Sequence, residues 1–300
     1  MSIEPFVHNT IKRSMATTFA QVKSWFQQTF GAIQPPKPSL LHIAIQNGQY
    51  EYVRRHLRDS VETAKSVLHD KNLLVLACHH HHWKIADLLV GHGVPVDGST
   101  DHLTPLMMAT EHDQENLVIQ LLRRGSNPNT RDVCGTTPLM VASMHGFVGI
   151  GARLLRHGAK VNLCDKSSMT ALMHACKFQH VGMVRQLLNY HAKVNLQSLS
   201  GTCKDGNLEI ADLLLTYGAN INGVDRTGVT PLMIACIHGH AHMVEYLLQK
   251  GANDQLKTKG GWSAWDFASI KSMDSCMESL QKFRVAPLYF IPIKDESPTV

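Results

Sequence analysis

The run Cys78-His79-His80-His81-His82 is the part of the sequence whose residue types could do chemistry most directly. Thiolate sulfur and imidazole nitrogen are the ligands that zinc sites in proteins use most. Ligands must converge on one point, however, whereas consecutive residues of a helix diverge by about 100° around its axis. The spacing therefore predicts no metal site in this run, and no cofactor is expected elsewhere in the chain.

Catalytic chemistry is the second possibility, because serines, acids and 19 histidines are available. No Gly-x-Ser-x-Gly, phosphate-binding loop or His-Glu-x-x-His motif is present. Met107, Met140, Met173 and Met233 recur at one position of a repeated pattern, which favours packing over contact with a cofactor. The sequence therefore predicts a protein that is not an enzyme.

The elements that position these residues repeat along the chain. A helix-opening motif related to Thr-Pro-Leu-x-x-Ala returns seven times, and every step but one is 32 or 33 residues. The copies start at Ser39, Asn72, Thr104, Thr137, Thr170, Thr230 and Ser263. This period and motif resemble the ankyrin-repeat family over about residues 39–283. The resemblance implies an all-α repeat solenoid of helix-turn-helix units with finger hairpins, which binds protein partners and has no pocket for turnover.

The domain organisation follows from the repeats. We expect an amphipathic helix and a proline-rich linker at residues 1–38, an array of about eight units at residues 39–284, and a tail at residues 285–300. Four cysteines fall six residues after a unit start, where the pattern calls for a small buried residue. These are Cys78, Cys176, Cys203 and Cys236, and no Cys-x-x-Cys pair occurs. They are predicted to be reduced core residues.

One unit shows how the pattern folds. Thr137 is placed to accept a backbone N–H as the N-cap of a first helix, and Pro138 suits its first turn. Gly146 is predicted to end this helix in left-handed geometry, and Gly158 to end the second helix. Equivalent stops are predicted at Gly93, Gly125, Gly218 and Gly251, and a recurring finger asparagine at Asn129, Asn195 and Asn222.

The unit at residues 196–222 is shorter than the others. About six residues are missing between Asn195 and the helix that starts at Leu208. The missing piece is predicted to be most of a first helix, which would make residues 196–207 a weak joint in a stack held together by contacts between neighbours.

The partner-binding face is predicted from the resemblance, which implies a concave side built from the fingers and the ends of the first helices. The exposed pairs there are His79 and His80, Glu111 and His112, Met144 and His145, Lys177 and Phe178, Lys204 and Asp205, and Ile237 and His238. The histidines favour either a groove for an acidic or phosphorylated segment that gains charge near pH 6, or a packing role on that surface. Both interpretations stay open at this point.

Before the array, apolar residues step by three or four along a helix of about 23 residues, or about 35 Å. They are Ile11, Met15, Phe19, Val22, Phe26, Phe30 and Ile33. The stripe fits a helix that docks on the stack, pairs with another protein, or lies on an anionic lipid surface, because no acid occurs between Glu4 and Glu51. Docking on the chain's own stack is the favoured hypothesis.

The composition of the chain limits the remaining classes of function. The net charge of +5 is mild and spread out, so direct nucleic-acid binding is disfavoured. No apolar run approaches the roughly 18 residues of a membrane span, and no secretory signal opens the chain. The leading hypothesis is a non-enzymatic scaffold or adaptor for an unidentified protein partner, inside the cell in the cytoplasm or nucleus. The alternative is a membrane-peripheral adaptor anchored by the N-terminal helix.

Overall fold

The computed structural model describes residues 39–59, 70–99 and 103–285. In these residues, short antiparallel helices follow one another in eight pairs. The pairs are α2 (Leu40–Gln46) with α3 (Tyr50–Asp59), α5 (Asn72–His79) with α6 (Trp83–Gly91), α7 (Pro105–Glu111) with α8 (Glu115–Arg123), α9 (Pro138–His145) with α10 (Val148–Arg156), α11 (Ala171–Lys177) with α12 (Val181–Asn189), α13 (Leu196–Asp205) with α14 (Leu208–Thr216), α15 (Pro231–Ile237) with α16 (Ala241–Gln249), and α17 (Ala264–Ile270) with α18 (Asp274–Val285).

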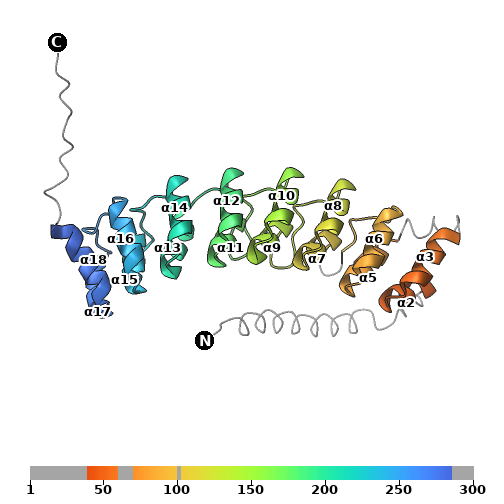
Figure 1. The fold of residues 1–300 in the computed structure, drawn as a ribbon, viewed down its shortest axis with the longest axis horizontal. Coiled ribbons are helices and arrows are strands. Elements are labelled where there is room, and N and C mark those ends of the chain that lie inside the picture. The colour runs from red at the N-terminus through yellow and green to blue at the C-terminus, as the bar shows by residue number, and fades with distance from the viewer. Residues whose placement is uncertain (1–38, 60–69, 100–102, 286–300) are drawn as a thin grey trace, which may run out of the picture.

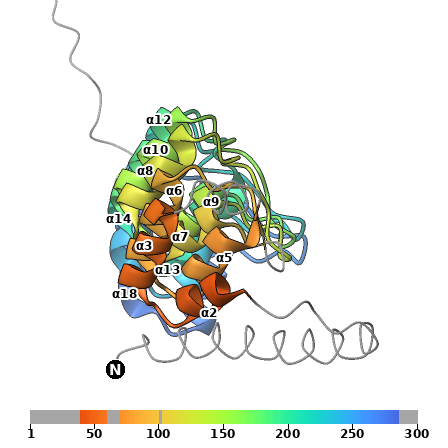
Figure 2. The ribbon, with the colours of Figure 1, turned by 90° about the vertical axis from the view of Figure 1, so that its right-hand side faces the viewer.

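The pairs stack side by side into one elongated, gently curved body. Second helices such as α10, α12 and α14 form its outer side, and first helices such as α9, α11 and α13 form the inner side of the curve (Figure 1). Seen along the stack, the connecting fingers project beyond the first helices (Figure 2). Within the described residues, strand-like structure is limited to isolated bridge residues, such as the bridge between Cys164 and Thr170. The predicted all-α repeat solenoid is confirmed.

The first helices α7, α9, α11 and α15 start where the sequence predicts. The side chains of Thr104, Thr137, Thr170 and Thr230 accept the backbone N–H three residues ahead at 3.2–3.4 Å. Such caps stabilise a helix by about 1 kcal/mol each, because the first backbone N–H groups have no partner inside the helix. The predicted glycine stops also hold, since Gly93, Gly125, Gly158, Gly218 and Gly251 all have positive φ.

The core runs without interruption from unit to unit. Leucines of the first helices, such as Leu139 and Leu172, and of the second helices, such as Leu154 and Leu187, are at most 1% exposed. Burial of each contributes about 1.5–3 kcal/mol. Cys78, Cys176, Cys203 and Cys236 are buried among them, as predicted.

A recurring contact joins three of the turns to the next unit. His180 hydrogen-bonds through Nε2 with the carbonyl of Met144 at 3.0 Å, and its ring covers Gly146 so closely that a Cβ there would lie 2.6 Å from Nδ1. His82 over Gly48 and His240 over Gly206 repeat this arrangement. The turn glycines are therefore required by an approaching ring as well as by their positive φ.

The shortened unit differs from its prediction. Residues 196–205 form a complete first helix, α13, in which Leu199 and Cys203 are fully buried. Asn195, predicted as a finger residue, is instead the N-cap of this helix, and its Oδ1 accepts the N–H of Ser198 at 2.9 Å. The prediction of a missing first helix at residues 196–207 is wrong. What the chain lacks is the finger, because α12 is joined to α13 by residues 190–195 alone.

The predicted N-terminal helix, the linker and residues 286–300 lie outside the described residues. At the end of the array, Cys276 and Leu280 of α18 are buried while most other described side chains of that helix contact water, as expected for a terminal unit. None of the helices in the described part of the chain is both long and apolar enough to cross a bilayer.

Candidate functional site

The twelve residues predicted to contact a partner lie at or directly after the C-terminal ends of six first helices, α5 to α15. We call this set the ladder. It comprises His79, His80, Glu111, His112, Met144, His145, Lys177, Phe178, Lys204, Asp205, Ile237 and His238. None of the twelve is buried, and Glu111, Met144, Phe178 and Ile237 are half-buried. The ladder is therefore an accessible row of mixed polar and apolar side chains.

Rings of the ladder stack on the residue that opens the second helix of the same unit. His145 stacks on Phe147 with centroids 5.3 Å apart, and Phe178 stacks on His180 at 6.5 Å. His238 and His240 repeat the arrangement at 6.5 Å. These contacts give the ladder rings a packing role, which was one of the two interpretations of the histidines.

The first units add an aromatic cluster. His81 meets His112 edge-on at 4.4 Å, and Trp83 lies 5.2 Å from the same His112 ring. Burial, followed by the nearby His81, lowers the pKa of His112, and burial together with neighbouring histidines lowers that of His80. Burial likewise lowers the pKa of His238, with the charge of Lys204 adding to the effect. These three imidazoles therefore stay neutral at physiological pH.

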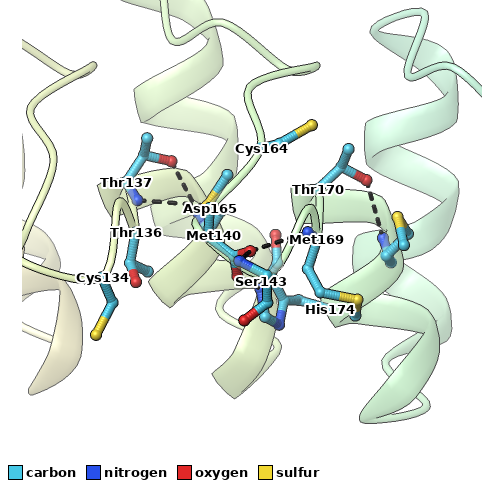
Figure 3. A network of polar contacts seen from close by, with 12 residues as sticks. Cys134, Thr136, Thr137, Met140, Ser143, Cys164, Asp165, Met169, Thr170 and His174 are labelled. Atoms are coloured by element: carbon cyan, nitrogen blue, oxygen red, sulfur yellow. Dashed lines mark hydrogen bonds and ion pairs between the residues drawn. The ribbon is translucent and has the colours of Figure 1, made fainter.

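The Cys78–His82 run does not converge on a point. Cys78 faces the core, where burial raises the pKa of its thiol to about 12, and a protonated thiol is a poor metal ligand. Across the residues that the structure describes, no three metal-ligating side chains are grouped to hold an ion. Cys134 and Cys164 are exposed, and they lie in neighbouring fingers (Figure 3).

A buried polar network fixes the finger between α10 and α11. One oxygen of Asp165 accepts the N–H groups of Ser167 and Met169 at 2.8 and 2.9 Å, and the other lies 2.9 Å from Nε2 of His174 (Figure 3). Burial alone raises the pKa of Asp165, but these hydrogen bonds outweigh it and hold the pKa below its ordinary value. Nδ1 of His174 is buried without a hydrogen-bond partner.

The same burial sets the charge of His174. It lowers the pKa of the imidazole, and the contact with Asp165 only partly offsets this effect. A second proton would sit on Nδ1, where no acceptor is present. The pair therefore consists of a carboxylate and a neutral imidazole that position the finger, which gives it a structural role.

A cleft that the sequence did not predict lies between α11 and α13, beside the missing finger. Its volume is about 420 Å³. Its walls include Met169, Met173, Cys176 and Gly201, and the ladder lysines Lys177 and Lys204 form part of its rim. The available signal was the identity of residue 201, because the equivalent position in other first helices carries Met108, Val141, His174 or Ile234.

Parts of this chain are similar in sequence to known proteins. A family profile described as ankyrin repeats (3 copies) matches residues 41–132, 114–198 and 199–284. Protein phosphatase 1 regulatory subunit 27 of Mus musculus is 50% identical over 48 residues, which are 16% of this chain and 31% of that protein. Tyrosine-protein kinase HTK16 of Hydra vulgaris is 29% identical over 99 residues, 32% of this chain and 13% of the kinase. The chain thus spans less than a third of the length of either relative.

This chain is also similar to a chain of a solved structure, the complex of the Bd0816 predatory endopeptidase from Bdellovibrio bacteriovorus with the immunity protein Bd3460. The match has a TM-score of 0.56 and 26% sequence identity, and it covers 61% of this chain and 98% of that chain.

Proposed function

The chain belongs to the ankyrin-repeat family, and from that premise we propose that it is a non-enzymatic scaffold which binds a protein partner through its concave face. The ladder supports this proposal, because it is a row of half-buried apolar and exposed polar side chains on consecutive units. Such a row offers an extended partner a repeated set of contacts and gives a small substrate little enclosure. The kinase relative matches over only 13% of its length, so no kinase activity is inferred.

The partner is proposed to meet this face inside the cell, in the cytoplasm or nucleus. Five free cysteines are buried in the described stack, an arrangement that suits a reducing compartment. Docking of the N-terminal stripe on the stack, and the alternative of contact with lipid, concern residues 1–38 and stay predictions. Direct nucleic-acid binding is not proposed, because the net charge of +5 is mild.

Site-specific photo-crosslinking tests the proposal. A photoreactive amino acid replaces His145 in the ladder, and in a control chain it replaces Arg156, which is exposed at the end of the outer helix α10. We expect protein adducts in cells from position 145 and few from position 156, read out by mass spectrometry. Adducts formed equally from both positions, or mainly from 156, would contradict binding through the concave face.

A further inference from the structure

The cleft between α11 and α13 exists because two absences coincide in one unit. The finger that would follow α12 is missing, and Gly201 stands where other first helices carry a large side chain. A Cβ added at Gly201 would meet no atom within 4 Å, so the space in front of this residue is open. Gly151 in α10 differs, since its added Cβ would lie 2.6 Å from Met183.

The chemistry of the cleft divides between its walls and its rim. The side chains of Met169 and Met173 and the thiol of Cys176, whose pKa burial raises to about 12, line it with neutral, polarisable groups. Thioether side chains adapt their shape to different apolar guests. Lys177 and Lys204 stand at the rim with one acid, Asp205, and they are the only lysines in the ladder. Gln197 and Ser198 add polar atoms to the lining, so the cleft combines a mainly apolar interior with a rim of two lysines and one acid.

We infer that this cleft is a specificity pocket, which receives one apolar side chain of a partner's acidic peptide segment while acids beside that side chain pair with Lys177 and Lys204. The inference rests on the proposed function, because it assigns one subsite to the same concave face. Successive first helices lie about 8–10 Å apart, and an extended strand advances about 3.3 Å per residue. Acids one or two residues from the anchor in either direction thus reach the two lysines on adjacent units.

The test uses the full chain and a defined set of labelled 11-residue peptides. Each peptide has a central Leu, Met, Phe or Ala, flanked on both sides by two Glu or by two Lys, and binding is followed by fluorescence polarisation. Gly201→Met fills the cleft, and methionine favours helix more than glycine does, so the variant keeps its fold. Gly91→Met is the matched control, because Gly91 is also helical, open to solvent and outside the cleft.

We expect Glu-flanked peptides with Leu, Met or Phe to bind, and Gly201→Met to weaken them by about tenfold or more, equivalent to about 1.4 kcal/mol. Lys177→Glu and Lys204→Glu should weaken the same peptides, and Gly91→Met should leave them unchanged. Binding that ignores Gly201→Met or the anchor residue overturns the inference, and so does the absence of binding by any peptide. In either case the crosslinking result at His145 still decides the proposed function.

Two other occupants would also overturn the assignment to a partner peptide. A dimer of the chain that Gly201→Met dissociates would assign the cleft to a second copy. Tighter peptide binding after removal of residues 286–300 would assign it to the chain's own tail.

Discussion

Two neighbouring pairs of first helices, α9 with α11 and α11 with α13, pack in the same way although the segments that lead into α11 and α13 differ in length. We call each packed pair a joint. In the first, residues 157–170 form a finger held by Asp165 and His174; in the second, residues 190–195 pass directly to the next helix. The first helices still pack against each other in both joints, and Leu172 and Leu199 are equally buried. Stacking of first helices therefore does not depend on the finger.

The finger adds a second row of contacts beyond the helices. The N–H of Lys166 in one finger donates to the carbonyl of Cys134 in the previous finger at 2.9 Å, and Lys259 donates to Thr227 in the same way. Between these two pairs of fingers stands the joint that has no finger of its own. Where this finger is absent, a cleft lies between α11 and α13 while the core stays intact, and this cleft is the proposed specificity pocket.

The largest expected effect tests whether the two joints are equally well packed. Leu199→Ala and Leu172→Ala should each lower the free energy of unfolding by about 3 kcal/mol, because each removes a fully buried leucine and leaves a cavity. Urea titration followed by circular dichroism measures both. A loss below about 1 kcal/mol for Leu199→Ala alone would mean that α13 is loosely packed and that the shortened unit is the weak joint after all.

A smaller loss of stability is expected when the contact between Asp165 and His174 is removed, because this contact distinguishes the finger before α11 from the other fingers. Asp165→Ala should lower the free energy of unfolding by about 2 kcal/mol, because it leaves two backbone N–H groups and His174 without their acceptor. Asp225→Ala is the control. Asp225 accepts two equivalent N–H groups but is exposed and has Ile234 in place of the histidine, so its loss should cost less. If both variants lowered the free energy of unfolding by the same amount, His174 would not contribute to the stability of this finger.

The pH dependence of stability provides a further check on the same pair. The pKa of His174 is lower in the folded chain than its ordinary value of 6.5, so protonation favours the unfolded state. The free energy of unfolding should be fully present above pH 6.5 and should fall as the pH drops from there toward the folded pKa. His174→Val, which copies Val141 of α9, should flatten this part of the profile relative to the wild-type chain. An unchanged slope would mean that other histidines, such as His112, carry the dependence.

The parts of this fold that the sequence predicted are those that depend on local spacing. A threonine before proline fixes a helix start, and a glycine with positive φ fixes its end, wherever the unit sits in the stack. The start of α13 was missed because it carries no Thr-Pro, and because Ser200, Gly201 and Thr202 have low helix propensity. Packing against α11 and α15 overrides that propensity, and this packing joins residues that are far apart in the sequence.

The candidate site was predictable to a similar extent. The positions of the ladder residues follow from the repeat, so a single chain was enough to place them at the helix ends. The contact of His112 with His81 and the cleft depend on packing between neighbouring units, and the lowered pKa values of His80, His112 and His238 depend mainly on burial, which the repeat pattern does not report. The cleft in particular lies where a finger and a large side chain are absent, and no sequence motif marks such an absence.

The smallest expected effect concerns how the joint without a finger starts its helix. Asn195→Ala should lower the free energy of unfolding by about 1 kcal/mol, because it removes the side-chain acceptor for the N–H of Ser198. Thr170→Ala, which removes the equivalent cap of α11, should cost a similar amount. Asn195→Gly should cost only a few tenths of a kcal/mol, since glycine exposes the end of the helix to water. Hydrogen exchange at Ser198 should rise in Asn195→Ala while exchange in α11 stays unchanged. If Asn195→Ala proved as harmless as Asn195→Gly, the asparagine would not be the residue that starts α13, and the direct passage from α12 would need another explanation.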